Sequence, residues 1–261
     1  MTAPGPELSI IIPAYNEQNR LPRTLARIIE YFCTRPVLSE LPADFTPDML
    51  EIVIVDDGST DRTACMAEEW TREMPIVRLV SNGDNRGKGY SVRRGMLEAR
   101  GRLALFTDAD LSSPIDEIAK LLAALAAGND VAIGSRALDR SLIAVHQSRL
   151  REWAGIIFNW LVRIATGLPF CDTQCGFKIF RRAPACVVFE QQRIEGFGFD
   201  PEALFLAKRH GLRTAEIAVR WAHDPATKVH VIRDSAIMFV DLIYIRWNWF
   251  WGRYPKRARK S

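Results

Sequence analysis

Residues 51–59 read Glu-Ile-Val-Ile-Val-Asp-Asp-Gly-Ser, a short run of β-branched residues that ends in two acids and a glycine. Four further apolar runs lie in the first half of the chain, over 8–12, 76–80, 102–106 and 130–134. Their apolarity is continuous rather than alternating, which is typical of strands covered on both faces in a parallel sheet. Helical patterns lie between them, over 20–32, 61–72, 90–99 and 115–127. This alternation predicts an α/β fold with a doubly wound, mostly parallel sheet and right-handed crossovers.

Past residue 135 the regular alternation ends, and four more elements are predicted. They are a helix over 150–165, a strand over 176–180, a helix over 201–209 and a strand over 214–221. The proline-rich stretch over 34–49 is predicted to be a loop insertion rather than a linker, because a strand follows it at once. We interpret residues 1–230 as one domain and residues 231–261 as a C-terminal amphipathic segment rich in tryptophan and basic residues.

The composition excludes several classes of protein. A chain of 261 residues that is 48% hydrophobic and 25% charged has enough apolar mass for a large core, which excludes disorder, collagen and disulfide miniproteins. The net charge of +4 is too small to indicate nucleic acid binding, and it is compatible with anionic lipid or phosphorylated ligands. The five cysteines are irregularly spaced and lack the paired motif of a zinc site, so reduced thiols are expected.

Acidic residues follow the predicted strand over 102–106. Asp108 and Asp110 are two positions apart, and on an extended segment this spacing places both carboxylates on one side. Mg²⁺ or Mn²⁺ shared with a diphosphate suits such a pair, because these ions take one or two carboxylates plus phosphate oxygens. The alternative is a solvated turn in which Ser112 or Ser113 caps the next helix. The position after a buried strand favours the metal, because ligands of open α/β sheets bind at the carboxyl ends of the strands.

Two other strand ends carry groups suited to a nucleotide or phosphate. Residues 85–89 read Asn-Arg-Gly-Lys-Gly, a basic loop that opens a helix. Its backbone N–H groups, the helix dipole and Lys88 together suit an anion. Asp56 and Asp57 end the strand quoted at the outset. The alternative for both places is a plain strand-to-helix turn, in which Gly58 supplies an unusual φ.

Taken in order, these motifs are far more specific than any one of them alone. The sequence resembles the inverting family 2 glycosyltransferases, and among them the dolichyl-phosphate β-glucosyltransferases, from Leu8 to about Tyr254. The motifs that carry the resemblance are Pro13-Ala-Tyr-Asn-Glu17, Val55-Asp-Asp-Gly-Ser59, Asn85-Arg-Gly-Lys-Gly89, Asp108-Ala-Asp110, Gly134-Ser-Arg136, Asp172-Thr-Gln-Cys-Gly-Phe-Lys178, Ala215-Glu-Ile-Ala-Val-Arg-Trp221 and Asp241-Leu-Ile-Tyr-Ile-Arg246. The resemblance implies a GT-A catalytic domain over residues 1–230.

The resemblance also implies roles for individual residues at the donor site. Pro13, Tyr15 and Glu17 would line the nucleotide pocket, and Asp57 would hold the base or the ribose. Lys88 would approach the donor. The acidic pair described above would hold Mg²⁺ or Mn²⁺ together with the donor diphosphate.

On the acceptor side, Ser135 and Arg136 lie where related polyprenyl-phosphate sugar transferases receive the lipid phosphate, and Arg149 is a further candidate. Asp172 is the remaining carboxylate suited to orient the acceptor, or alternatively it is a turn-forming side chain. A phosphate monoester is already largely dianionic at neutral pH, so a cationic guide such as Arg136 is more useful than a strong general base. The predicted catalytic residues are Asp108, Asp110, Asp172 and Arg136.

The C-terminal segment predicts contact with a membrane surface. Aromatic and apolar residues over 239–251 precede basic residues over 253–260, a pattern typical of an interfacial element. The alternative is a C-terminal helix packed on the core with a solvated tail. The helix over 150–165 is either the second half of this surface or part of the core. No stretch reaches the ~20 apolar residues of a membrane span, and the first residues lack the features of a signal peptide, so we expect a cytoplasmic location.

The sequence thus predicts a peripheral enzyme at the cytoplasmic face of a membrane that transfers glucose from UDP-glucose to a polyprenyl phosphate of the dolichyl type. Its predicted partners are a sugar nucleotide, the lipid phosphate and the membrane surface, without nucleic acid. Two alternatives stay open: a mannosyltransferase that uses GDP-mannose, and a nucleotide-sugar binding protein without turnover. The motif over 172–178 favours glucose, and the intact acidic pair argues against a loss of turnover.

Overall fold

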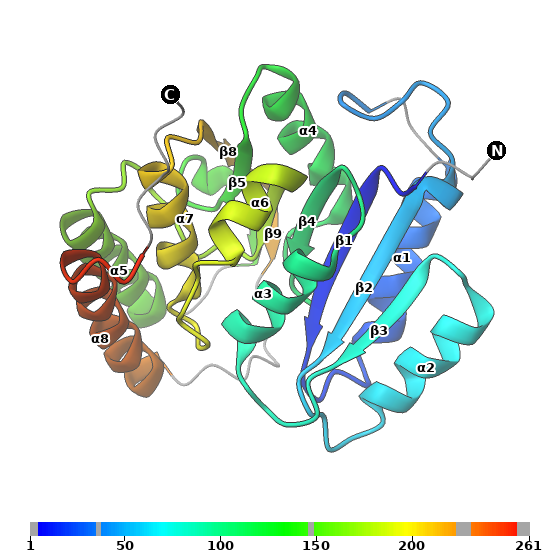
Figure 1. The fold of residues 1–261 in the computed structure, drawn as a ribbon, viewed down its shortest axis with the longest axis horizontal. Coiled ribbons are helices and arrows are strands. Elements are labelled where there is room, and N and C mark those ends of the chain that lie inside the picture. The colour runs from blue at the N-terminus through cyan, green and yellow to red at the C-terminus, as the bar shows by residue number, and fades with distance from the viewer. Residues whose placement is uncertain (1–4, 35–37, 146–148, 223–230, 255–261) are drawn as a thin grey trace.

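The computed structural model describes residues 5–34, 38–145, 149–222 and 231–254. Its centre is a seven-stranded sheet in the order β3-β2-β1-β4-β7-β5-β8, with helices on both faces (Figure 1). The strands are β1 (Leu8–Ala14), β2 (Leu50–Asp56), β3 (Val77–Ser81), β4 (Leu103–Thr107), β5 (Val131–Ser135), β6 (Ile143–Val145), β7 (Phe177–Arg181), β8 (Thr214–Ala218) and β9 (Trp221–Ala222). The helices are α1 (Leu21–Thr34), α2 (Thr63–Glu73), α3 (Lys88–Glu98), α4 (Ile118–Ala126), α5 (Arg149–Thr166), α6 (Arg182–Phe189), α7 (Phe199–Arg209) and α8 (Val231–Phe250).

The first four strands form the parallel half of the sheet. β1 pairs in parallel with β2 on one side and with β4 on the other, and β2 pairs in parallel with β3. The chain therefore winds outward in both directions from β1, which confirms the predicted doubly wound α/β fold. The carboxyl ends of β1, β2 and β4 consequently meet at one edge of the sheet.

One strand runs against the others. β7 is inserted between β4 and β5 and pairs antiparallel with both. It brings the segment that precedes it, residues 172–176, to the same sheet edge as the residues that follow β4. The predicted single strand over 214–221 is interrupted: β8 ends at Ala218, and β9 pairs separately with β6.

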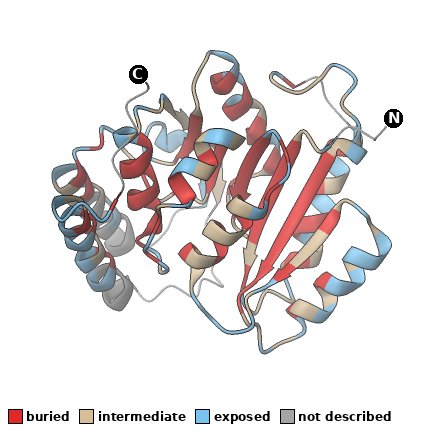
Figure 2. Cartoon of the chain, viewed as in Figure 1, coloured by how far each residue is buried: buried red, intermediate tan, exposed pale blue. Residues whose placement is uncertain are grey.

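Apolar side chains on the two faces of the sheet form two cores. Ile11 of β1 packs with residues of α3, α6 and α7, whereas its neighbours Ile10 and Ile12 pack with residues of α1, α2 and α4. Because both faces are covered, the central strands are largely buried (Figure 2) and mostly apolar. The helix α6 was not predicted from the sequence.

The C-terminal helix α8 packs beside α5 at the end of the molecule remote from β3 (Figure 1). Its inner face contributes Met238, Leu242 and Ile245 to the core, and Tyr254 beyond its end is buried in the same cluster. Other side chains of α8 are exposed, among them Trp247 and Phe250. No helix in the described part of the chain has the length and apolarity needed to span a bilayer.

Candidate active site

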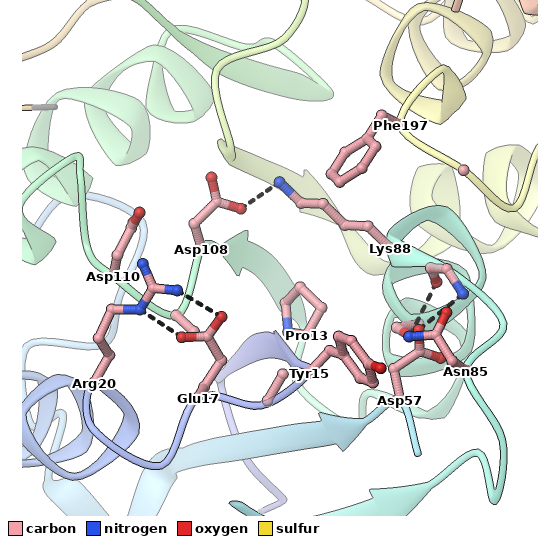
Figure 3. A pocket seen from close by; sticks show the side chains of 15 residues that line it. Pro13, Tyr15, Glu17, Arg20, Asp57, Asn85, Lys88, Asp108, Asp110 and Phe197 are labelled. Carbon is pink, nitrogen blue, oxygen red and sulfur yellow. Dashed lines mark hydrogen bonds and ion pairs between the residues drawn. The ribbon is translucent and has the colours of Figure 1, made fainter. Parts of the chain in front are cut away.

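A cavity of about 410 Å³ opens where β1, β2 and β4 end (Figure 3). It gathers side chains from strand ends and loops that lie far apart in the sequence. The residues that line it are Pro13, Ala14, Tyr15, Glu17, Arg20, Asp57, Asn85, Gly87, Lys88, Ser91, Asp108, Ala109, Asp110, Gly196 and Phe197. All the residues predicted for the donor site and the metal are therefore in one pocket.

The acidic pair lies in a turn directly after β4. The backbone N–H of Leu111 donates to the carbonyl of Asp108 at 3.1 Å, and Leu111 has a φ of 48°. The expected extended segment is thus a tight turn, yet both carboxylates still face the pocket. Burial, and next the negative charge of Asp108, raise the pKa of Asp110 above its ordinary value. A divalent cation would relieve both effects, so two hard oxygen donors here fit Mg²⁺ or Mn²⁺.

Lys88 approaches the acidic pair from the turn that opens α3. Its Nζ lies 2.5 Å from Oδ1 of Asp108 (Figure 3). Burial lowers the pKa of Lys88, but the carboxylates of Asp108 and Asp200 outweigh burial and raise it, so the lysine is charged. Gly87 has a φ of 102°, a left-handed conformation that favours glycine. The glycine-flanked lysine therefore presents a cation to the pocket.

Asp57 organises this lysine turn. Its Oδ1 accepts hydrogen bonds from Asn82 Nδ2 at 2.7 Å and from the backbone N–H of Arg86 at 3.0 Å, and its Oδ2 accepts one from Gly87 at 2.8 Å. The carboxylate also lines the pocket, as the sequence predicted for a base or ribose contact. Three of its acceptor positions are already used, so its first role in the structure is to anchor the loop that carries Lys88.

The opposite wall of the pocket comes from the end of β1. Tyr15 is 37% exposed, and its ring projects into the pocket beside Pro13 (Figure 3). Glu17 pairs with both ends of the Arg20 guanidinium, at 2.5 Å to Nε and 2.9 Å to Nη2. A bidentate pair fixes the orientation of both side chains. Arg20 therefore fixes the orientation of Glu17 in the pocket. Arg20 itself was not predicted as a site residue.

Three residues predicted for the acceptor form a second cluster that does not line this pocket. Arg136 donates to Asp172 from Nε at 2.6 Å, from Nη2 at 2.9 Å and from its backbone N–H at 3.0 Å. Asp172 is 1% exposed, and although burial would raise its pKa, the charge of Arg136 lowers it to about 2. Asp172 is consequently a very weak base. Ser135 is fully buried, and its hydroxyl accepts from the N–H of Ala137 at 3.3 Å.

The two clusters meet at Gly176. The backbone N–H of Asp108 donates to the carbonyl of Gly176 at 3.2 Å. A Cβ built on Gly176 would overlap the Asp108 carboxylate, so only glycine allows this approach. The predicted motif over 172–178 therefore supports the acidic pair directly, and Arg136 is close enough to Asp108 for their charges to interact.

Some predicted site residues cannot be placed, and others were not foreseen. Arg149 is the first residue of α5, and its side chain lies outside the described residues. The basic residues over 255–261 also lie outside them. The pocket residues that were not predicted as site residues are Arg20, Ser91, Gly196 and Phe197, and Asn85 was selected only as part of the motif over 85–89. In the described chain no three His, Cys, Asp or Glu side chains gather as a metal site, so a metal here would take its remaining ligands from substrate or water.

Solved structures share this architecture. Glucosyl-3-phosphoglycerate synthase from Mycobacterium tuberculosis, crystallised with Mn²⁺, UDP and glucosyl-3-phosphoglycerate, superposes with a TM-score of 0.60 at 17% identity, covering 97% of this chain and 82% of that one. Mannosyl-3-phosphoglycerate synthase from Rubrobacter xylanophilus superposes with a TM-score of 0.66 at 18% identity, covering 98% and 78%. The fold is that of the GT-A glycosyltransferases.

The sequence matches Glycosyl transferase family 2 over residues 9–187, and the chain belongs to this family. It is 36% identical over 243 residues to a dolichyl-phosphate β-glucosyltransferase of Trichomonas vaginalis, covering 91% of this chain and 72% of that protein. It is 37% identical to the dolichyl-phosphate β-glucosyltransferase of Drosophila melanogaster, covering 97% and 76%, and 33% identical to the human one, covering 97% and 78%. The resemblance identified from the motifs is confirmed.

Proposed function

We propose that this chain transfers glucose from UDP-glucose to a polyprenyl phosphate. The observation that carries the proposal is the single pocket that joins the Asp108 and Asp110 carboxylates to Lys88 and Tyr15. This combination suits a nucleotide diphosphate, because it offers oxygen ligands for a metal, a cation for phosphate and an aromatic surface for a base. The relatives named above supply the sugar and the class of lipid.

At the donor, Asp108 and Asp110 would hold Mg²⁺ or Mn²⁺, whose chemistry when bound is to neutralise charge that develops on the departing diphosphate. Lys88 adds a second positive charge on the same side. The Glu17 and Arg20 pair and the Tyr15 ring orient the nucleotide against the end of β1. These residues act on the leaving group, which is where negative charge increases in a single displacement with inversion.

At the acceptor, a lipid phosphate oxygen attacks the anomeric carbon. The phosphate needs no strong base, since it is largely dianionic near neutral pH. The low basicity of Asp172 is therefore no obstacle to the reaction. Its carboxylate instead holds Arg136 in one orientation. Arg136 stays 28% exposed and is the cation we assign to guiding the acceptor phosphate. Ser135 was also predicted for this role, but its side chain is fully buried, so we assign it no contact with the phosphate. Arg149 stays a proposed further contact.

We also propose that α5 and α8 form the surface that meets the membrane at its cytoplasmic face. Both helices carry large apolar side chains that are exposed. This membrane-facing surface consists of Ile157, Trp160, Ile164, Phe239, Val240, Ile243, Trp247, Phe250 and Trp251. Contiguous exposed apolar side chains indicate a binding surface, and aromatic residues favour the lipid headgroup region. The phosphate of a polyprenyl lipid lies at the bilayer surface, so an enzyme that uses it needs such a contact.

The experiment that tests the proposed function is a donor competition assay. Purified protein is mixed with vesicles that contain polyprenyl phosphate, Mn²⁺ and either UDP-[¹⁴C]glucose or GDP-[¹⁴C]mannose. We expect a labelled, organic-soluble product from UDP-glucose that excess unlabelled UDP-glucose suppresses. Product from GDP-mannose alone would support the mannosyltransferase instead. Nucleotide binding without product from either donor would refute transfer to this lipid and support the binding protein.

A further inference from the structure

The pocket is bordered on one side by a short segment between α6 and α7, residues 193–198, here named the Phe197 segment. Gly196 and Phe197 line the pocket, and Figure 3 shows the Phe197 ring near the side chain of Lys88. The segment also packs on the turn that carries this lysine. The backbone N–H of Tyr90 donates to the carbonyl of Glu195 at 3.1 Å, and a Cβ on Gly87 would lie 2.5 Å from the same oxygen.

The start of the Phe197 segment is held from the C-terminal end of the chain. Glu202 is fully buried in α7, and its carboxylate accepts hydrogen bonds from the backbone N–H groups of Arg193 at 3.0 Å and Ile194 at 2.8 Å. The hydroxyl of Tyr254 donates to the other Glu202 oxygen at 2.5 Å. Tyr254 is 1% exposed and lies just beyond α8. Tyr254 therefore holds the Glu202 carboxylate in place, and this carboxylate holds the start of the Phe197 segment.

The far end of the Phe197 segment touches α8 itself. The backbone of Gly198 packs directly on the buried side of the Asp241 carboxylate. A Cβ on Gly198 would overlap that carboxylate, so the backbone and the side chain are in direct contact. Asp241 lies one helical turn from both Met238 and Ile245, which are buried, and so it belongs to the inward side of α8.

We propose that Tyr254 and Asp241 are positioning residues of the active site, which hold the Phe197 segment at both ends and through it orient Phe197 and Lys88. The chain of contacts runs from α8 to the segment, from the segment to the lysine turn, and from Lys88 to Asp108. The opposite side of α8 is the membrane-facing surface. The contacts of Tyr254 and Asp241 therefore lie between the membrane-facing surface and the pocket.

The test compares Tyr254→Phe and Asp241→Asn with the wild type and with Tyr244→Phe. Tyr244 is the control, because it is a tyrosine on α8, the helix of Asp241, and 39% of its surface is exposed, whereas Tyr254 is buried. Hydrogen–deuterium exchange of residues 193–198 is measured without substrate, and kcat and KM are measured with detergent-dispersed acceptor. Both test variants are expected to speed exchange there and to lower kcat by about ten-fold each, because a small misplacement of reacting groups is costly. The control is expected to match the wild type in both measurements.

Two results would overturn the proposal. One is unchanged exchange over 193–198 in both test variants, and the other is faster exchange with an unchanged kcat. If one variant fails to fold, the other still tests the proposal, because the two substitutions act at opposite ends of the segment. The kinetic part rests on the proposed function, but the exchange part does not. A wild-type enzyme that proves to use GDP-mannose would refute the proposed donor, and both readouts would then be repeated with that donor.

Discussion

The Nζ of Lys88 lies 2.5 Å from Oδ1 of Asp108, so the cation of one loop neutralises an acid of another across the pocket. The two residues come from the start of α3 and the end of β4. Asp108 also belongs to the pair assigned to the metal, and the lysine therefore competes with a metal for this oxygen before the donor binds. When a diphosphate is present, Lys88 and the metal would share the same negative charge.

Replacing Lys88 with methionine tests this relationship. We expect Lys88→Met to lower kcat about 10²-fold, because one cation that faces the leaving group is lost from a water-poor site. Apparent affinity for Mn²⁺ without nucleotide should rise, since the competing charge is gone. Lys120→Met is the control, because Lys120 pairs with Glu117 outside the pocket. Steady-state kinetics and Mn²⁺ titration followed by electron paramagnetic resonance measure the two effects. Full activity in Lys88→Met would show that the leaving group does not need this charge.

The contact between Gly176 and Asp108 predicts a steric effect. Gly176→Ala would push the Asp108 carboxylate away from its position, and we expect transfer to fall at least about 10²-fold while the protein still folds. Gly155→Ala is the matched control, since a Cβ there meets nothing within 4 Å. Circular dichroism reports folding, and the transfer assay reports activity. Equal activities of the two variants would mean that the position of Asp108 is unimportant.

The buried pair of Arg136 and Asp172 predicts a pH-dependent contribution to stability. The pKa of Asp172 is about 2 in the folded protein, against an ordinary value of 3.8. A lowered pKa stabilises the fold above the unfolded value, and this stabilisation is lost as the pH falls through the folded value. The difference in unfolding free energy between wild type and Asp172→Asn should therefore shrink by about 2 kcal/mol from pH 5 to pH 2. Urea unfolding at several pH values measures it, and a difference independent of pH would contradict the assignment.

The membrane-facing surface predicts reversible vesicle binding. We expect the double variant Trp247→Ser and Phe250→Ser to sediment with vesicles of phosphatidylcholine and phosphatidylserine at least about ten-fold more weakly than the wild type, because buried apolar area at the interface is lost. Leu138→Ser is the control, since Leu138 is 46% exposed outside this surface. Transfer to a detergent-dispersed acceptor should change little. Vesicle binding equal to that of the control would exclude α8 as the contact.

Much of the fold follows from local sequence. The five first strands begin and end within two residues of their predicted positions. Four of them, β1, β2, β4 and β5, are mostly apolar runs that the sheet buries, whereas β3 lies at the edge of the sheet and is only partly buried. Two features depend on long-range contacts and were not predicted. One is the antiparallel insertion of β7 between β4 and β5. The other is α6, which begins directly after β7 without a turn residue to separate them.

Part of the candidate site could also be predicted from local sequence, and part of it depends on long-range contacts. Donor and metal residues such as Tyr15 and Lys88 directly follow strands or open a helix, and the topology brings strand ends together, so sequence order was enough to group them. Phe197 reaches the pocket only through the packing of α7 and α8, which no local pattern records. Arg136 and Asp172 were each selected as separate acceptor residues. Their mutual ion pair spans 36 positions and emerged only in the structure.

The heat of UDP-glucose binding, measured by calorimetry with Mn²⁺ or with excess chelator, tests whether the acidic pair binds the donor through a metal. We expect binding that requires the metal and that Asp110→Asn weakens at least about ten-fold, whereas Asp116→Asn binds as the wild type does. Asp116 is a suitable control because it is exposed and pairs with Arg220 outside the pocket. Equally tight binding of UDP-glucose by the wild type with chelator and with Mn²⁺ would show that the acidic pair does not bind the donor through a metal.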